Sequence, residues 1–201
     1  CFVDNNLNLI KFDLLEKNAI AAGSIASIYL INYNNKKSIL KRKNDNIDKL
    51  MKKSKESLKL FLKIIAIFTK YNFFNNFDFN DYFSFLKFQT FMDLEAVNQL
   101  KFIRIFKKYD NIIIPQVHYF NRENLVMEYQ PGLKLNEIAV KFPEFEFEAM
   151  SIIYAAMIVM VQNKVLHGDL HYGNFSFKII DDSIKLIILD FGVICEFTNE
   201  R

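Results

Sequence analysis

The stretch HGDLHYGN at residues 167–174 and the tetrapeptide LDFG at residues 189–192 decide the fold expected for this chain. Asp169 precedes Asn174 by five positions, and Asp190 follows directly on an apolar run. Carboxylate and amide oxygens in this order hold Mg²⁺ against phosphate oxygens in phosphoryl transfer. Alone, HGD is typical of a turn and DFG of a strand end. Together they predict a phosphoryl-transfer site, with Asp169 as the catalytic carboxylate and Asn174 and Asp190 as metal ligands.

An upstream lysine fits the same site. The turn signal YNNK at residues 33–36 and the apolar run SILK at residues 38–41 predict a β-hairpin that ends near Lys41. In sites of this kind a strand lysine contacts the α- and β-phosphates and pairs with a glutamate on a helix. We expect Glu95 to be the partner, with Glu123 as a much weaker alternative. A lysine at a strand end is otherwise usually a surface residue, so the assignment depends on the downstream motifs.

Four small residues precede this hairpin, where a glycine-rich phosphate-binding loop would stand: Ala21, Ala22, Gly23 and Ser24. With fewer glycines, the backbone N–H groups have less room to wrap around phosphates. We therefore expect this loop to bind the nucleotide in an altered way rather than not at all.

The apolar run LVMEY at residues 125–129 is followed by the breaker cluster QPG. An adenine ring needs one backbone acceptor and one backbone donor beside an apolar slot. We expect the carbonyl of Glu128 and the N–H of Gln130 to supply these, with Met127 at the back of the slot. The same run would also serve as an ordinary core strand, and the two interpretations are compatible.

The apolar pattern predicts helices over much of the remaining chain. Apolar residues recur near a 3.6-residue period from 46 to 70, with lysines between them. Residues 71–81 are expected to be a connection, and a second helical stretch runs from about 82 to 108. Pro143 begins a further predicted helix that reaches about Asn163 and should be buried, because its second half is almost wholly apolar.

Composition limits the other functional classes. The net charge of +3, from 26 basic and 23 acidic residues, gives no support for nucleic-acid binding. The lysines between 49 and 59 indicate a solvated helix face or, alternatively, contact with phosphates or an anionic membrane surface. Cys1 and Cys195 form no spaced pair, which favours a reducing, intracellular setting. The longest apolar run, residues 149–161, is shorter than the ~20 residues that span a bilayer, and no signal peptide is visible.

With these motifs in place, the chain resembles the UbiB/ADCK family of atypical protein-kinase-like proteins. The family has an alanine-rich loop, and AIAAGSIASIY matches it with Gly23 where alanine is usual. The family strand VAVK corresponds to SILK. Fifty-four positions then separate Lys41 from Glu95, the first residue of the EAVN motif, and this long gap is typical of the family. HGDLHYGN matches the pattern HxDxHPGN with Tyr172 in place of proline, and LDFG matches without change.

The resemblance implies an α+β, two-lobed protein-kinase-like fold. Residues 1–130 would form a small lobe with an antiparallel sheet and a helical insertion at about 46–108. Residues 131–201 would form part of a helical large lobe. The family's KxGQ extension and most of the large lobe after DFG have no counterpart here, so we expect a truncated product or one segment of a longer chain.

The resemblance further implies binding of ATP with Mg²⁺ and an ATPase-like or small-molecule-kinase-like activity. It implies a link to ubiquinone or other prenyl-lipid metabolism, with prenyl-lipid precursors or lipid-biosynthetic proteins as partners. Peripheral contact with a mitochondrial or bacterial-type inner membrane would follow. Two alternatives stay open: a nucleotide-gated pseudokinase that acts as a binding module, and a small-molecule kinase of the aminoglycoside or sugar type.

Overall fold

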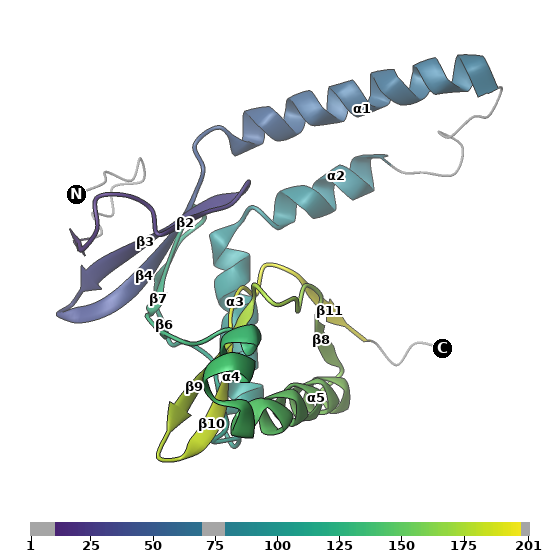
Figure 1. Ribbon diagram of the computed structural model, residues 1–201. Coiled ribbons are helices and arrows are strands. Elements are labelled where there is room, and N and C mark those ends of the chain that lie inside the picture. Colours follow the sequence, from purple (N-terminus) through teal and green to yellow (C-terminus); the bar gives the residue numbers. More distant parts are fainter. Residues whose placement is uncertain (1–10, 70–78, 198–201) are drawn as a thin grey trace.

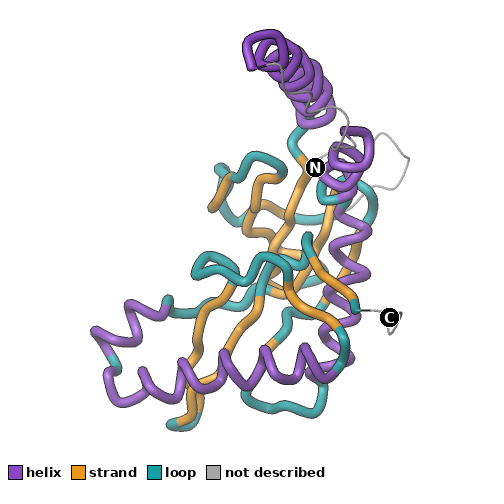
Figure 2. The backbone as a smooth tube through the Cα atoms, turned by 90° about the vertical axis from the view of Figure 1, so that its right-hand side faces the viewer, coloured by secondary structure: helices purple, strands orange, loops and turns teal. Residues whose placement is uncertain are grey.

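The computed structural model describes residues 11–69 and 79–197. An antiparallel sheet near the N-terminus and a second, mixed part toward the C-terminus are joined by one helix that runs alongside both (Figures 1 and 2). Two further helices extend away from this body. The predicted connection at 71–81 lies mostly outside the described residues. Among the helices within the described ranges, none combines the length and apolarity needed to cross a bilayer.

The first sheet carries Lys41, as predicted. Its strand order is β1-β3-β4-β7-β6, with β2 paired to β3, and every pairing is antiparallel. The strands are β1 (Asp13–Leu14), β2 (Ala21–Ala22), β3 (Ala26–Tyr33), β4 (Lys36–Lys43), β6 (Val117–Phe120) and β7 (Asn124–Glu128). Asn34 and Asn35 form the β3–β4 turn with φ of 51° and 62°, because a two-residue hairpin turn favours this left-handed pair of conformations. In this register Lys41 stands between Ile28 and Leu125.

The helical region after β4 contains three helices: α1 (Ile47–Thr69), α2 (Phe79–Phe88) and α3 (Met92–Phe106). The prediction of one helical stretch from 82 to 108 is therefore wrong, because α2 and α3 are separate helices. The side chain of Thr90 donates a hydrogen bond to the carbonyl of Lys87, while the N–H of Met92 is taken by the carbonyl of Arg122. These bonds divert the backbone and let α3 begin in a new direction. Met92 and Ala96 of α3 then pack against the first sheet.

The C-terminal part contains a three-stranded sheet in the order β5-β10-β9 and a two-stranded pair of β8 with β11. Its strands are β5 (Ile112–Ile113), β8 (Val165–His167), β9 (Phe175–Ile180), β10 (Ser183–Ile188) and β11 (Ile194–Glu196). The helices are α4 (Leu135–Lys141) and α5 (Glu146–Gln162), the latter preceded by a 3₁₀ turn at Pro143–Phe145. The expected boundary near residue 130 falls in the connection between β7 and α4.

Helix α5 corrects the expectation that it is buried throughout. Its inner face carries Ala149, Ile152, Ala156, Val159 and Met160, which pack in the main core with β10 and β8. On its other face Tyr154, Ile158 and Val161 are each more than half exposed. Ser151 and Tyr154 are the sole interruptions of the apolar run at 149–161, and its second half has none, so periodicity there gives no sign of which face is covered.

Candidate nucleotide-binding site

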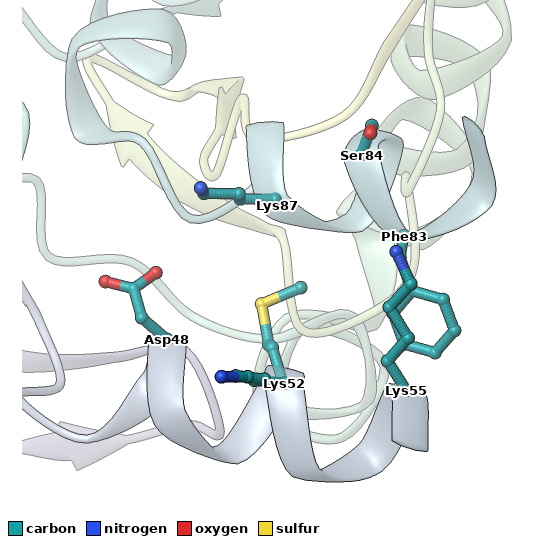
Figure 3. A pocket seen from close by; sticks show the side chains of 7 residues that line it. Asp48, Lys52, Lys55, Phe83, Ser84 and Lys87 are labelled. Carbon is teal, nitrogen blue, oxygen red and sulfur yellow. The ribbon is translucent and has the colours of Figure 1, made fainter. Parts of the chain in front are cut away.

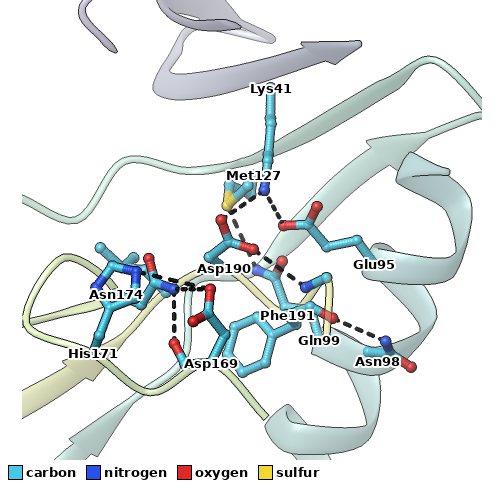
Figure 4. A network of polar contacts seen from close by, with 12 residues as sticks. Lys41, Glu95, Asn98, Gln99, Met127, Asp169, His171, Asn174, Asp190 and Phe191 are labelled. Atoms are coloured by element: carbon cyan, nitrogen blue, oxygen red, sulfur yellow. Dashed lines mark hydrogen bonds and ion pairs between the residues drawn. The ribbon is translucent and has the colours of Figure 1, made fainter. Parts of the chain in front are cut away.

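Three charged side chains from distant parts of the chain meet between the two sheets (Figure 4). Lys41 comes from β4, Glu95 from α3 and Asp190 from the segment after β10. The Nζ atom of Lys41 lies 2.8 Å from Oε1 of Glu95 and 3.0 Å from Oδ2 of Asp190. The predicted pairing of Lys41 with Glu95 is thus present, whereas the alternative Glu123 lies on the surface, in the turn before β7.

The burial of these groups sets their electrostatics. The Glu95 side chain is 2% exposed and that of Lys41 11%, while Asp190 is 43% exposed. Burial raises the pKa of Glu95 against the opposing effect of Lys41. Burial acts to lower the pKa of Lys41, but the two carboxylates outweigh it and raise that pKa above its usual value. For Asp190, burial acts to raise the pKa, and the Lys41 charge reverses the direction and lowers it. Asp190 therefore stays ionised and keeps an exposed face for a cation.

The DFG segment is held in a defined conformation. Asp190 has a left-handed φ of 57°, and its Oδ1 accepts a hydrogen bond from the N–H of Gly192 at 3.2 Å. The ring of Phe191 is 1% exposed and packs against Phe102 and His167. The His167 ring in turn contacts the carbonyl of Leu189 at 3.1 Å. These contacts fix the backbone that presents Asp190.

The loop at residues 167–174 holds the Asn174 side chain against Asp169. Its Nδ2 donates to the backbone carbonyl of Asp169 at 2.9 Å and to the Asp169 carboxylate at 3.3 Å. The amide nitrogen is thereby used by Asp169, so the amide oxygen is the atom left to bind a cation. His171 lies close to the same carboxylate, with Nε2 3.8 Å from Oδ2 of Asp169, and its Nδ1 accepts the Gly173 N–H. Asp169 itself is more than half exposed and so can meet an acceptor from solvent.

A pocket of about 260 Å³ adjoins the Lys41 cluster, close to the lower end of the ~300–1,000 Å³ usual for small-molecule sites. Many of the predicted site residues line it: Ala21, Lys41, Glu95, Met127, Glu128, Gln130, Asn174 and Asp190. Asp169 is not among the lining residues and lies beside Asn174. Ala22, Gly23 and Ser24 do not line the pocket either. The reason is visible in the loop, where the Gly23 N–H bonds to the Ala26 carbonyl and the Asn44 side chain holds the carbonyls of Gly23 and Ser24.

Several lining residues had not been singled out from the sequence. Ile20, Ile28, Ile39 and Leu189 give the pocket apolar walls, and Tyr129 and Gly173 complete it. A signal for Ile39 existed in the alternation of the hairpin. Ile39 and Lys41 are two residues apart on β4 and so share a face of the strand.

A larger pocket, of about 410 Å³, lies between α1 and α2 (Figure 3). Met51 and Phe83 supply its apolar surface, and Lys52, Lys55 and Lys87 surround it. Lys55 donates to the side chain of Asn80. None of the predicted motifs contributes to this pocket, and we place the candidate site at the smaller one because the paired charges gather there.

The donor set suits Mg²⁺ bound together with phosphates. Within residues 11–69 and 79–197, no group of three or more His, Cys, Asp and Glu side chains is arranged to hold a metal ion by itself. Asp190 and Asn174 instead offer one carboxylate and one amide oxygen. Mg²⁺ usually takes one or two carboxylates and completes its octahedron with waters and substrate phosphates. The residues present therefore fit a metal that arrives with a nucleotide.

Comparison with protein families identifies a kinase-like domain in the chain. The profile of the ABC1 atypical kinase-like domain matches residues 6–201. No curated protein matches the chain in sequence.

Comparison with solved structures shows the fold. The complex of Rv3197 with erythromycin from Mycobacterium tuberculosis superposes with a TM-score of 0.68 at 18% identity, over 93% of this chain and 48% of that one. The Rio2 kinase complex with ADP, Mg²⁺ and phosphoaspartate from Chaetomium thermophilum gives a TM-score of 0.53 at 14% identity, over 92% of this chain and 49% of that one. The chain spans about half the length of either structure. Its fold is kinase-like, as predicted.

Proposed function

The chain belongs to the ABC1 atypical kinase-like family, the domain of the UbiB/ADCK proteins, and from this premise we propose that it binds ATP with Mg²⁺ in the Lys41 pocket and transfers or hydrolyses the terminal phosphoryl group. One observation carries the proposal. The ammonium of Lys41 lies within 3.0 Å of both a buried glutamate and a partly exposed aspartate. This arrangement places a cation for phosphates beside a carboxylate for a metal.

Each side chain then has a definite task. Glu95 holds the Lys41 ammonium toward the pocket, where it would contact phosphate oxygens. Asp190 and Asn174 would ligate the metal, whose charge offsets that of the transferred group. Asp169, oriented by its two hydrogen bonds from Asn174, would accept the proton of an acceptor hydroxyl or of water.

The adenine end of the pocket is formed by β7 and the residues after it. Met127, Glu128 and Gln130 line the pocket together with Gly173 and Asn174 of the loop at residues 167–174. Met127 is 8% exposed and packs with the α3 side of the sheet, so it can close the back of an apolar slot. The carbonyl of Glu128 and the N–H of Gln130 would then pair with the edge of the purine.

A thermal-shift titration with Mg-ATP tests this site. We expect Mg-ATP to stabilise the parent chain and Asp190→Asn to remove the metal-dependent part of the shift. Asp182→Asn is the matched control, because Asp182 also follows a strand with a positive φ, of 55°, but lies in an exposed turn. An unshifted but folded parent, or an Asp190→Asn variant that responds as the parent does, would overturn the proposal.

Turnover separates an enzyme from a binding module. Mg-dependent ATP hydrolysis above the level of a Lys41→Ala variant supports the enzyme, and binding without it supports a nucleotide-gated pseudokinase. ATP consumption that rises with an aminoglycoside or sugar, and not with phenolic lipid precursors, would instead support a small-molecule kinase of that type.

We further propose a role in ubiquinone or other prenyl-lipid metabolism at a mitochondrial or bacterial-type inner membrane, and family membership is the support for it. One feature supports contact with an anionic surface. Helix α1 carries six lysines against two acidic residues, and Leu50, Phe61 and Phe68 along it are each more than half exposed. Such a helix suits the interface of an anionic bilayer. Co-sedimentation with anionic vesicles, but not with neutral vesicles, is the expected result, and equal behaviour with both contradicts it.

A further inference from the structure

We propose that Asn98 is a positioning residue that holds the Asp190–Gly192 segment in its metal-binding conformation. The inference rests on the proposed function of the site and concerns a residue to which that function gives no task. Asn98 is the last residue of the EAVN motif, and its Nδ2 donates a hydrogen bond to the backbone carbonyl of Phe191 at 2.9 Å (Figure 4). The two residues are 93 positions apart in the chain.

Asn98 belongs to a row of α3 residues that contact the DFG segment directly or through Lys41. Residues 95, 98 and 102 are spaced by three and four positions and so share one face of the helix. The ring of Phe102 lies with its centroid 5.0 Å from that of Phe191, and Glu95 contacts the Lys41 ammonium that also contacts Asp190. One helix face therefore contacts the carbonyl and the ring of Phe191 directly and the Asp190 carboxylate through Lys41.

The conformation held by this row is the one that presents Asp190. Asp190 adopts a left-handed φ of 57°, which non-glycine residues avoid unless the surroundings impose it. Rotating the Asp190–Phe191 backbone to a relaxed conformation would turn the Phe191 carbonyl away from Asn98. It would also withdraw the Asp190 carboxylate from Lys41. The Asn98 bond thus favours the arrangement in which Asp190 faces the pocket.

Loss of this bond should weaken the binding of Mg²⁺ more than the binding of ATP. Asn98 bonds the Phe191 carbonyl and is not among the residues that line the nucleotide pocket. Its effect on binding must pass through the position of Asp190, which is a predicted metal ligand. An Asn98→Ala change removes one hydrogen bond, so we expect the Mg²⁺ concentration at half-saturation of ATP binding to rise about 3- to 10-fold. ATP affinity in the presence of a metal chelator should stay within about twofold of the parent value, because changes at independent sites usually add to within about that factor.

Isothermal titration of the whole chain with ATP, at a series of Mg²⁺ concentrations and with chelator, measures both quantities. Asn98→Asp is the second variant, because it keeps the size of the side chain while placing an acceptor against the Phe191 carbonyl. It should raise the Mg²⁺ requirement at least as much as Asn98→Ala. Val97→Ala is the matched control, since Val97 is its exposed neighbour on α3, and it should leave the Mg²⁺ requirement unchanged.

The outcomes separate this inference from the function it rests on. A parent chain with no Mg-dependent ATP binding overturns the proposed function and the inference with it. A parent that binds Mg-ATP, with Asn98 variants that need no more Mg²⁺, overturns the inference alone. If the Asn98 variants lose ATP binding in chelator and ATP binding in Mg²⁺ to the same extent, Asn98 has a general packing role. That result also overturns the inference. Circular dichroism of each variant confirms that α3 and the rest of the chain are folded in the comparison.

Discussion

Replacing Lys41 by methionine should destabilise the chain strongly at neutral and alkaline pH. Methionine keeps most of the length of the side chain but removes the cation that lies 2.8 Å from Glu95. The Glu95 carboxylate, 2% exposed, would then be a buried charge facing Asp190 without its compensating partner. Removing one member of a buried ion pair costs about 3–5 kcal/mol. We expect a loss of this size in the free energy of unfolding at pH 8.

The loss should shrink as the pH falls. Burial already raises the pKa of Glu95 above its ordinary value, and Lys41 is the group that opposes this. Without Lys41 the folded-state pKa rises further, while the unfolded-state pKa stays near ~4.3. A carboxyl whose pKa is raised by folding destabilises the folded state at pH above that pKa, and protonation relieves the cost as the pH drops through it. Between the two pKa values the relief is about 1.4 kcal/mol per pH unit for one proton.

Urea unfolding followed by circular dichroism suits this test, because the chain has no tryptophan for fluorescence. The difference in unfolding free energy between the parent and Lys41→Met is measured from pH 5 to pH 8. The double variant Lys41→Met/Glu95→Gln is the control, since it removes the buried charge and should recover stability at pH 8. A pH-independent difference, or a double variant that is no more stable than Lys41→Met, would refute the electrostatic argument.

Three further predictions concern the backbone and the metal. In Gly132→Ala the new Cβ would lie 2.5 Å from Oγ of Ser176, so we expect a loss of about 1–3 kcal/mol in unfolding free energy, partly restored by adding Ser176→Gly. Asn35→Ala should cost about 1 kcal/mol by urea unfolding, because alanine disfavours the φ of 62° in the hairpin turn; no loss would show that the turn rearranges. Asn174→Ala should weaken ATP binding in Mg²⁺ and leave binding in chelator unchanged, as measured by calorimetry, and an equal loss in both would contradict a role as metal ligand.

The parts of the fold that were predicted correctly depend on local chemistry. The hairpin followed from two asparagines at its turn, and the structure has both of them between β3 and β4 with positive φ. The pairing of Lys41 with Glu95 was also predicted, although 54 positions separate them. That prediction drew on the spacing of a family motif, since nothing local to either residue indicates the other.

The errors arose where tertiary contacts decide the outcome. The break between α2 and α3 depends on the Arg122 carbonyl, which takes the N–H of Met92 from 30 positions away. Residues 22–24 stay a predicted nucleotide contact, but Asn44 bonds the carbonyls of Gly23 and Ser24, and the composition of the loop alone does not reveal that bond. In both places a hydrogen bond to a distant segment holds the backbone.

In the site, too, some roles can be predicted from the type of residue, and others depend on the tertiary contacts of the residue. Charged side chains indicate ionic interactions by their type, so roles could be predicted for the lysine, the glutamate and the two aspartates before their positions were known. An asparagine on a helix has no such signature, because its amide serves caps, turns and surfaces equally well. Asn98 acquires a task only through the carbonyl of Phe191, which the fold brings to it. The spacing of residues 95, 98 and 102 on one helix face was visible in the sequence. What that face contacts required the structure, and for this reason the positioning role is the one most in need of experimental test.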